Sequence, residues 1–257
     1  MAYITFQPKD YFNTLLYDGN GSTNARTGLG FEPDWIWIKN KTGDHDHYLF
    51  DQVRGATKHI RSNTTNTEGT TSGVTSFDSD GFTLGSSDGM NENGRDFVAW
   101  NWRASGTSGS SNTDGTINTT YTSVNTTAGF SISTYTGTGS NATVGHGLGV
   151  APKWVMIKRR DDTADWRMFT EVNGNQSQMS LSQTSAADSG NTTMWNATSP
   201  TTTTFSIGAH SNVNSNGGTY VAYCFAEKKG FSKFGSYTGN ANADGAFIYT
   251  GFKPAFV

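Results

Sequence analysis

The chain has 257 residues, of which 15% are charged and 13% aromatic, and its formal net charge is −3. It contains no basic stripe that could neutralise phosphates, so we expect no nucleic-acid partner. No stretch approaches the roughly 20 apolar residues of a membrane span, and the first six residues lack the basic start and apolar run of a signal peptide. We therefore expect a protein that is made in the cytosol and stays there or leaves without the Sec pathway.

Similar segments recur along the chain. Residues 28–39 (GLGFEPDWIWIK) return as 147–158 (GLGVAPKWVMIK) and begin again at 251–257 (GFKPAFV). A Tyr-Thr-Gly or Tyr-Asp-Gly triplet starts 16, 17 and 17 residues before the proline of each copy (33 − 17, 152 − 135 and 254 − 237). Two further matches pair 81–85 with 204–208, and 97–102 with 220–225. The sequence therefore predicts an array of similar modules.

The elements expected in these modules are strands. From 35 to 38, alternation places Trp35 and Trp37 on one face and Ile36 and Ile38 on the other, so both faces are apolar and the strand is central. The segment 97–102 has the same character. Residues 78–81 (DSDG) have the turn chemistry of a hairpin that leads into the next strand.

Short strands separated by Gly, Asn and Ser clusters, in a unit of about 110 to 120 residues, are typical of a β-sandwich or jelly roll. We predict an all-β fold of tandem β-sandwich, jelly-roll-like modules. The expected divisions are an N-terminal arm (1–9), module 1 (10–104), a linker (105–114), module 2 (115–229) and the opening strands of a truncated third module (230–257).

Five strings together resemble a known family: 31–39, 49–55, 76–82, 98–102 and 220–227. The family is a repeat family of uncharacterised domains in virion structural and tail-fibre-like proteins of marine bacteriophages, and the resemblance covers almost the whole chain. It implies a closed symmetric homo-oligomer, with a trimer favoured, and it transfers no catalytic or binding residue. Because the third repeat normally continues in such proteins, the chain is expected to be a fragment or to lack its remaining part.

One cluster has metal-ligand chemistry. His45 and His47 are two apart in an extended segment and point the same way, with Asp44 and Asp46 beside them, which suits Zn or Ni. The matching segment 161–165 of module 2 has no histidine, and no third or fourth ligand can be named. A solvated loop is the better interpretation, so we predict no metal site and no cofactor.

Two other motifs have a simpler explanation. Asp78 and Asp80 resemble the start of a calcium loop, but the later ligands and the terminal Glu are absent, so a turn is expected. Residues 85–89 (GSSDG) match the nucleophile-elbow pattern around Ser87 by accident of composition, without a placed His and acid. We therefore predict no catalytic residues and no enzymatic activity.

Aromatic residues and the one cysteine are assigned to the core. Five tryptophans occur on predicted strands and are expected in the core or between modules: Trp35, Trp37, Trp100, Trp102 and Trp154. Trp166 and Trp195 lie in segments that the modules share less well, and either could be exposed. Cys224 lies in an apolar strand and is predicted to be a buried, inert thiol.

These observations favour a bacteriophage virion structural protein, a tail fibre, spike or other surface appendage involved in host attachment. Its expected partners are other virion proteins, copies of itself and a glycan or protein of the host surface. Two alternatives are a capsid decoration protein and a carbohydrate-binding β-sandwich array. A hydrolase would need paired carboxylates in a shared cleft, and no acid pair recurs at matching positions of both modules.

Overall fold

The structure is a computed structural model that describes residues 7–257, so most of the predicted arm (1–9) lies outside the described residues. The chain enters through a 3-10 helix, η1 (Pro8–Asp10). In residues 7–257 all sheets are antiparallel and the two α-helices have one turn each, which confirms the predicted all-β sandwich fold.

Module 1 is a six-stranded sheet packed on a three-stranded one. The large sheet has the order β1 (Phe12–Asp18), β9 (Asp96–Trp102), β3 (Trp35–Asn40), β4 (His47–Asp51), β5 (Lys58–Arg61) and β6 (Gly69–Thr70). The small sheet has the order β2 (Asn24–Thr27), β8 (Gly81–Leu84) and β7 (Val74–Asp78), and the one-turn helix α1 (Asp88–Asn91) follows β8. Ile36, Ile38 and Phe97 of the large sheet and Phe82 and Leu84 of the small one close a core between them.

Module 2 repeats this plan. Its large sheet has the order β10 (Tyr121–Asn125), β11 (Phe130–Thr136), β18 (Thr219–Phe225), β13 (Trp154–Arg159) and β14 (Arg167–Thr170). Smaller pairs are β12 (Ala142–Gly145) with β17 (Thr204–Ile207), and β15 (Ser177–Gln178) with β16 (Asp188–Ser189), and α2 (Ser211–Asn214) is again one turn long. Val155, Ile157 and Tyr220 lie in its own core with Phe205 and Ile207.

The same side-chain contacts hold both modules. Tyr17 stacks on Phe97 with ring centroids 5.2 Å apart and donates to the carbonyl of Met90. Tyr135 stacks on Tyr220 at 5.1 Å and donates to the carbonyl of Val213 in the same way. The tyrosine of the repeated Tyr-Asp/Thr-Gly triplet therefore joins a strand of the large sheet of its module to the helical turn.

A buried asparagine closes each helical turn. The Asn91 amide donates to the carbonyls of Ser22 (2.6 Å) and Gly85 (2.7 Å), and the Asn214 amide donates to those of Ser140 (2.6 Å) and Gly208 (3.0 Å). Both side chains are fully buried.

We expect Asn91→Ala and Asn214→Ala each to lower the free energy of unfolding by about 2 kcal/mol, because each leaves buried backbone carbonyls without a donor. Urea denaturation of the two variants beside wild type checks this. A loss below about 0.5 kcal/mol in both would show that the clamp contributes little.

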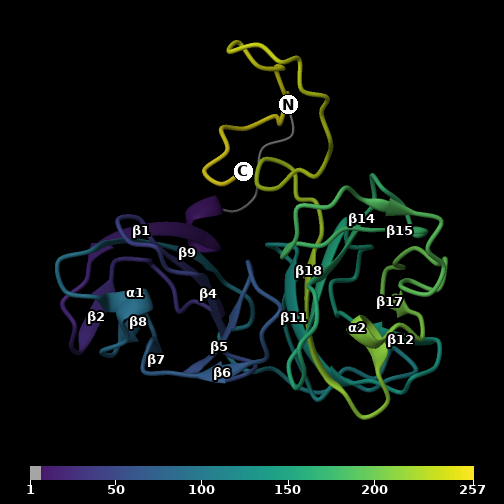
Figure 1. The fold of residues 1–257 in the computed structure, drawn as a ribbon, viewed down its shortest axis with the longest axis horizontal. Helices are drawn as coiled ribbons and strands as arrows, with labels where there is room; N and C mark the ends of the chain where they lie inside the picture. Colours follow the sequence, from purple (N-terminus) through teal and green to yellow (C-terminus); the bar gives the residue numbers. More distant parts are fainter. Residues whose placement is uncertain (1–6) are drawn as a thin grey trace.

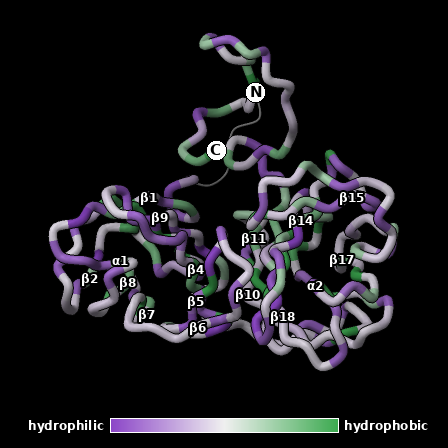
Figure 2. Tube along the Cα trace, in the orientation of Figure 1, coloured by the Kyte–Doolittle hydropathy of each residue, from purple (hydrophilic) through white to green (hydrophobic). Residues whose placement is uncertain are grey.

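The two large sheets pack face to face and share a second core, which makes the modules one body (Figure 1). Trp35 of module 1 lies at its centre, 1% exposed, stacked on Tyr223 (4.8 Å) and Phe130 (5.7 Å) of module 2. Hydrophobic colouring is concentrated on the strands where the modules meet, and the outer loops are mostly polar (Figure 2).

The opening strands predicted for 230–257 are not formed, and this segment is irregular apart from an isolated bridge between Lys228 and Ser232. In module 1, β1 and β3 are both held by pairing with β9, the 97–102 segment of the repeat. Residues 230–257 contain no copy of that segment, so the third copy has no strand on which to form a ladder.

Candidate functional site

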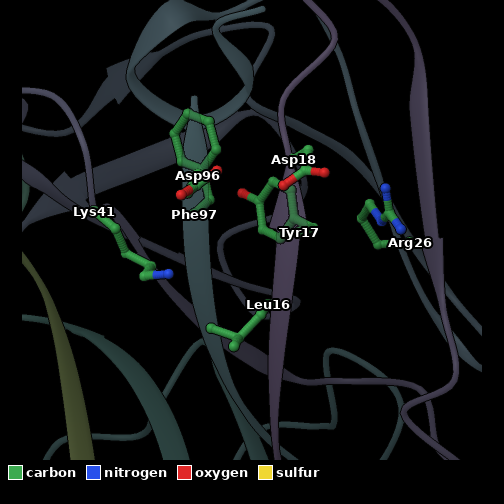
Figure 3. Close-up of a pocket in the computed structure, with 7 residues that line it drawn as sticks. All are labelled: Leu16, Tyr17, Asp18, Arg26, Lys41, Asp96 and Phe97. Carbon is green, nitrogen blue, oxygen red and sulfur yellow. The ribbon is translucent and has the colours of Figure 1, made fainter. Parts of the chain in front are cut away.

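A shallow depression of about 400 Å³ opens on module 1 beside the paired strands β1 and β9 (Figure 3). Its lining combines two aspartates, two basic residues and three apolar side chains: Leu16, Tyr17, Asp18, Arg26, Lys41, Asp96 and Phe97. The Arg26 guanidinium lies 5.7 Å from the Tyr17 ring centroid, within cation–π range. A depression with this lining could hold a small polar ligand by charge and hydrogen bonding.

The two aspartates are a carboxylate pair that the sequence search did not single out. Asp18 and Asp96 are directly opposite each other in the β1–β9 ladder, so their side chains project from neighbouring positions on one face. The same register positions of module 2 carry Thr136 and Thr219. The pair therefore occurs in module 1 and not in module 2. It can be found only when the residues that face each other in the β1–β9 ladder are known.

His45 and His47 engage different partners. The Nδ1 atom of His47 accepts a hydrogen bond from the Trp37 indole at 2.9 Å, whereas His45 lies 3.4 Å from a carboxylate oxygen of Glu92. Burial, together with the charge of Lys39, holds the pKa of His47 below its ordinary value. Within residues 7–257, no group of three or more His, Cys, Asp or Glu side chains is placed to hold a metal ion.

Asp78 and Asp80 belong to the predicted hairpin. Asp78 pairs with Gly81 across a two-residue turn between β7 and β8, which confirms the turn. The Asp80 carboxylate accepts hydrogen bonds from the backbone N–H groups of Gly28 (3.0 Å) and Gly30 (2.6 Å). This aspartate therefore fixes the glycine loop that opens the repeated motif.

Ser87 caps the backbone of the short helix α1, and its hydroxyl accepts a hydrogen bond from the Thr71 hydroxyl at 3.1 Å. Trp166 and Trp195, which could have been exposed, are buried at 0% and 2%. Their indole N–H groups donate to the carbonyls of Arg61 and Ser177. Cys224 is also buried, which raises the pKa of its thiol and agrees with an inert role.

A charged network crosses the junction of the modules. The Arg54 guanidinium lies 2.5 Å from the Asp51 carboxylate and 3.2 Å from Glu68, and all three belong to module 1. Module 2 supplies Arg160, which makes two hydrogen bonds to Glu68 at 2.9 and 3.0 Å, and Tyr223, which donates to Asp51 at 2.5 Å. Burial alone would lower the pKa of Arg54, but its interactions with Asp51, Tyr223 and Glu68 together outweigh burial and raise the pKa.

Lys158 is a second buried charge at this junction. Burial lowers its pKa to about 8, a shift that can mark a functional lysine. Its amine donates to the carbonyls of Thr65 in module 1 (3.1 Å) and Ala164 in module 2 (2.8 Å). The contacts join two loops across the junction, so the lysine has a structural role that explains its burial.

His59 of β5 gives the fold a pH dependence. Its imidazole is 8% exposed, and burial, followed by the charges of Arg61 and Arg54, lowers its pKa to about 4. Between pH 6.5 and 4 the unfolded chain then binds more protons at this residue than the folded one, so acidification destabilises the fold.

We expect the free energy of unfolding to fall by about 2 kcal/mol from pH 7 to pH 5 because of this group. His59→Gln should remove that part of the pH dependence. Urea denaturation of both proteins at the two pH values measures the difference, and identical profiles would contradict the assignment.

None of the helices in the described part of the chain is long and apolar enough to cross a membrane. No curated protein and no solved structure shows significant similarity to the chain. One domain family, described as a domain of unknown function, matches residues 7–257, which include both modules and the C-terminal segment. The chain therefore belongs to the DUF7483 domain family.

Proposed function

We propose that the chain is a structural protein of a bacteriophage virion, in a tail fibre, spike or other surface appendage that contributes to host attachment. The observation that carries the proposal is the core shared by the two modules. Trp35 and the Arg54–Glu68–Arg160 network bury aromatic and charged groups between them. A pair joined in this way moves as one rigid unit, which suits a protein that transmits or resists force.

The chemistry of the buried groups supports the same view. Of the charged groups at the junction, Glu68 and Lys158 contact partners across it and so hold the modules together, and Arg54 binds Glu68 from the module 1 side. The resemblance of the repeated motifs to phage virion structural proteins supplies the phage setting. The proposal includes a homotrimer, virion localisation, and contacts with other virion proteins and with a host-surface glycan or protein.

The test uses virions of the phage that encodes this chain. Peptides of the chain should be found by mass spectrometry of purified particles, and gold-labelled antibodies should mark the tail or its fibres. Label over the capsid would favour a decoration protein instead, and absence from the particles would refute a virion role. Light scattering of the purified chain should give three times the 27.7 kDa chain mass.

A carbohydrate-binding role is the second candidate, because the depression beside β1 and β9 joins charged groups to the exposed side chain of Leu16. Thermal stabilisation by a host glycan would favour it. Asp96→Asn should then abolish that stabilisation, and Thr219→Val, at the equivalent position of module 2, is the matched control.

A further inference from the structure

The packing face of each large sheet can be divided into two halves. In module 1, the β3–β4 half carries Trp35 and Leu49, and the β1–β9 half carries Phe12, Trp100 and Trp102. In module 2, the β11–β18 half carries the equivalent residues Phe130, Tyr223 and Phe225, and the β13–β14 half carries Trp154.

The aromatic contacts where the modules meet run from the β3–β4 half of module 1 to the β11–β18 half of module 2, and Met156 and Met168 of the β13–β14 half also belong to the shared core. Trp35 of the β3–β4 half packs on the β11–β18 half, with ring centroids 5.7, 4.8 and 5.9 Å from Phe130, Tyr223 and Phe225. The β1–β9 half of module 1 and Trp154 of module 2 lie at the margin of this core, and several of their rings are only partly buried. Each module therefore keeps partly buried aromatic rings beside the shared core that another neighbour can cover.

The C-terminal segment lies against the partly buried rings of both modules. Phe256 contacts the β1–β9 half, with its ring centroid 6.1 Å from Phe12, 5.6 Å from Trp100 and 5.4 Å from Trp102. Its ring centroid also lies 6.3 Å from Trp37 of the neighbouring strand β3. Phe234 lies 6.1 Å from Trp154. In Figure 1 the segment, drawn in yellow, sits above and between the two modules.

The Phe256 contacts copy those of Trp35. Phe256 follows Pro254 by two residues, as Trp35 follows Pro33 and Trp154 follows Pro152. By strand register, Phe12, Trp100 and Trp102 are the module 1 counterparts of Phe130, Tyr223 and Phe225. The third copy of the motif therefore meets module 1 through the same surface that the first copy uses on module 2.

We propose that the β1–β9 half-face is a docking site for the aromatic residue of a Pro-x-aromatic motif, and that residues 230–257 fill it as the third member of a closed ring. In this ring module 1 docks on module 2 through Trp35, module 2 docks on the third member through Trp154, and the third member docks back on module 1 through Phe256. A contact between two different half-faces either closes a ring or continues as a filament. The return of Phe256 to module 1 closes it, and this inference does not depend on the proposed virion function.

The test is hydroxyl-radical footprinting of the full chain, which reports the solvent access of individual tryptophans. In Phe256→Ala, oxidation of Trp100 and Trp37 should rise about fivefold. The loss of one aromatic pair raises the population in which the C-terminal segment is undocked by about this factor. Phe256→Trp should keep them protected, because the first two copies of the motif carry tryptophan. Phe247→Ala is the matched control, since Phe247 lies in the same segment and is exposed.

Trp195, buried in the core of module 2, reports whether each variant remains folded. Unchanged oxidation of Trp100 in Phe256→Ala, with Trp195 still protected, would overturn the docking site. Protection of Trp100 that weakens on dilution of wild type would show that a second copy fills the site, and would overturn the ring within one chain. Loss of protection in Phe247→Ala as well would show that the packing of the segment is not specific to the motif.

Discussion

Replacing Trp35 with alanine should lower the free energy of unfolding by about 4 kcal/mol, the range expected for a large aromatic lost from a core. The side chain is fully enclosed between the modules and contacts three aromatic rings of module 2. Because the core that it centres belongs to both modules, the variant should also weaken their docking. Chemical denaturation followed by far-UV circular dichroism measures the loss.

Trp154→Ala is the matched control, because Trp154 occupies the equivalent strand position in module 2 but is only partly buried. We expect a loss of about 1.5 kcal/mol there, since less apolar area leaves water. Equal losses in the two variants would contradict the assignment of Trp35 to a shared core. A second unfolding transition in Trp35→Ala alone would show that the modules have separated.

The sequence predicted the parts of the fold that depend on local pattern. Alternation in 35–38 identified β3, and residues 78–81 identified the β7–β8 turn. Both signals are local, because the pleat of a strand and the conformation of a turn depend on residues that are neighbours in the sequence. Equivalent strings identified equivalent strands, since each of the first two copies of the motif pairs with the equivalent strands of its own module.

Contacts between residues far apart in the chain could not be predicted from the sequence. Tyr223 donates to Asp51 across 172 residues of chain, and Trp166 reaches the Arg61 carbonyl across 105. No spacing signals such contacts, so Trp166 could not be placed in the junction core. For the same reason the Asp18–Asp96 pair, formed across the β1–β9 ladder, escaped a search for local acid clusters.

The third copy shows the limit of reasoning from a motif. The segment 251–257 resembles the start of a strand, but a strand exists only when another strand satisfies its N–H and C=O groups. What survives without the ladder is the aromatic contact, because Phe256 reaches the β1–β9 half-face of module 1 without any strand pairing. For this segment the motif therefore predicts the packing of its aromatic residue correctly, but not its secondary structure.

The junction network should be the second large determinant of stability. Arg54→Met removes a guanidinium that is fully buried between Asp51 and Glu68, so the Asp51 carboxylate stays buried without its cation. Removing one partner of a buried ion pair costs about 3 to 5 kcal/mol, and we expect about 4 kcal/mol in urea denaturation. Arg159→Met, in a more exposed cluster with Asp161 and Asp162, should cost less than about 1 kcal/mol.

The double variant Asp51→Asn with Arg54→Met separates charge from packing. If the loss in Arg54→Met comes from an uncompensated buried charge, neutralising Asp51 should recover about half of it, because an amide costs less to bury than an unpaired carboxylate. The oxygen of the introduced amide can still accept the hydrogen bond that Tyr223 donates to Asp51 in the wild type. No recovery would mean that the buried stem of Arg54 contributes more to stability than its charge, and that packing stabilises the junction more than ion pairing does.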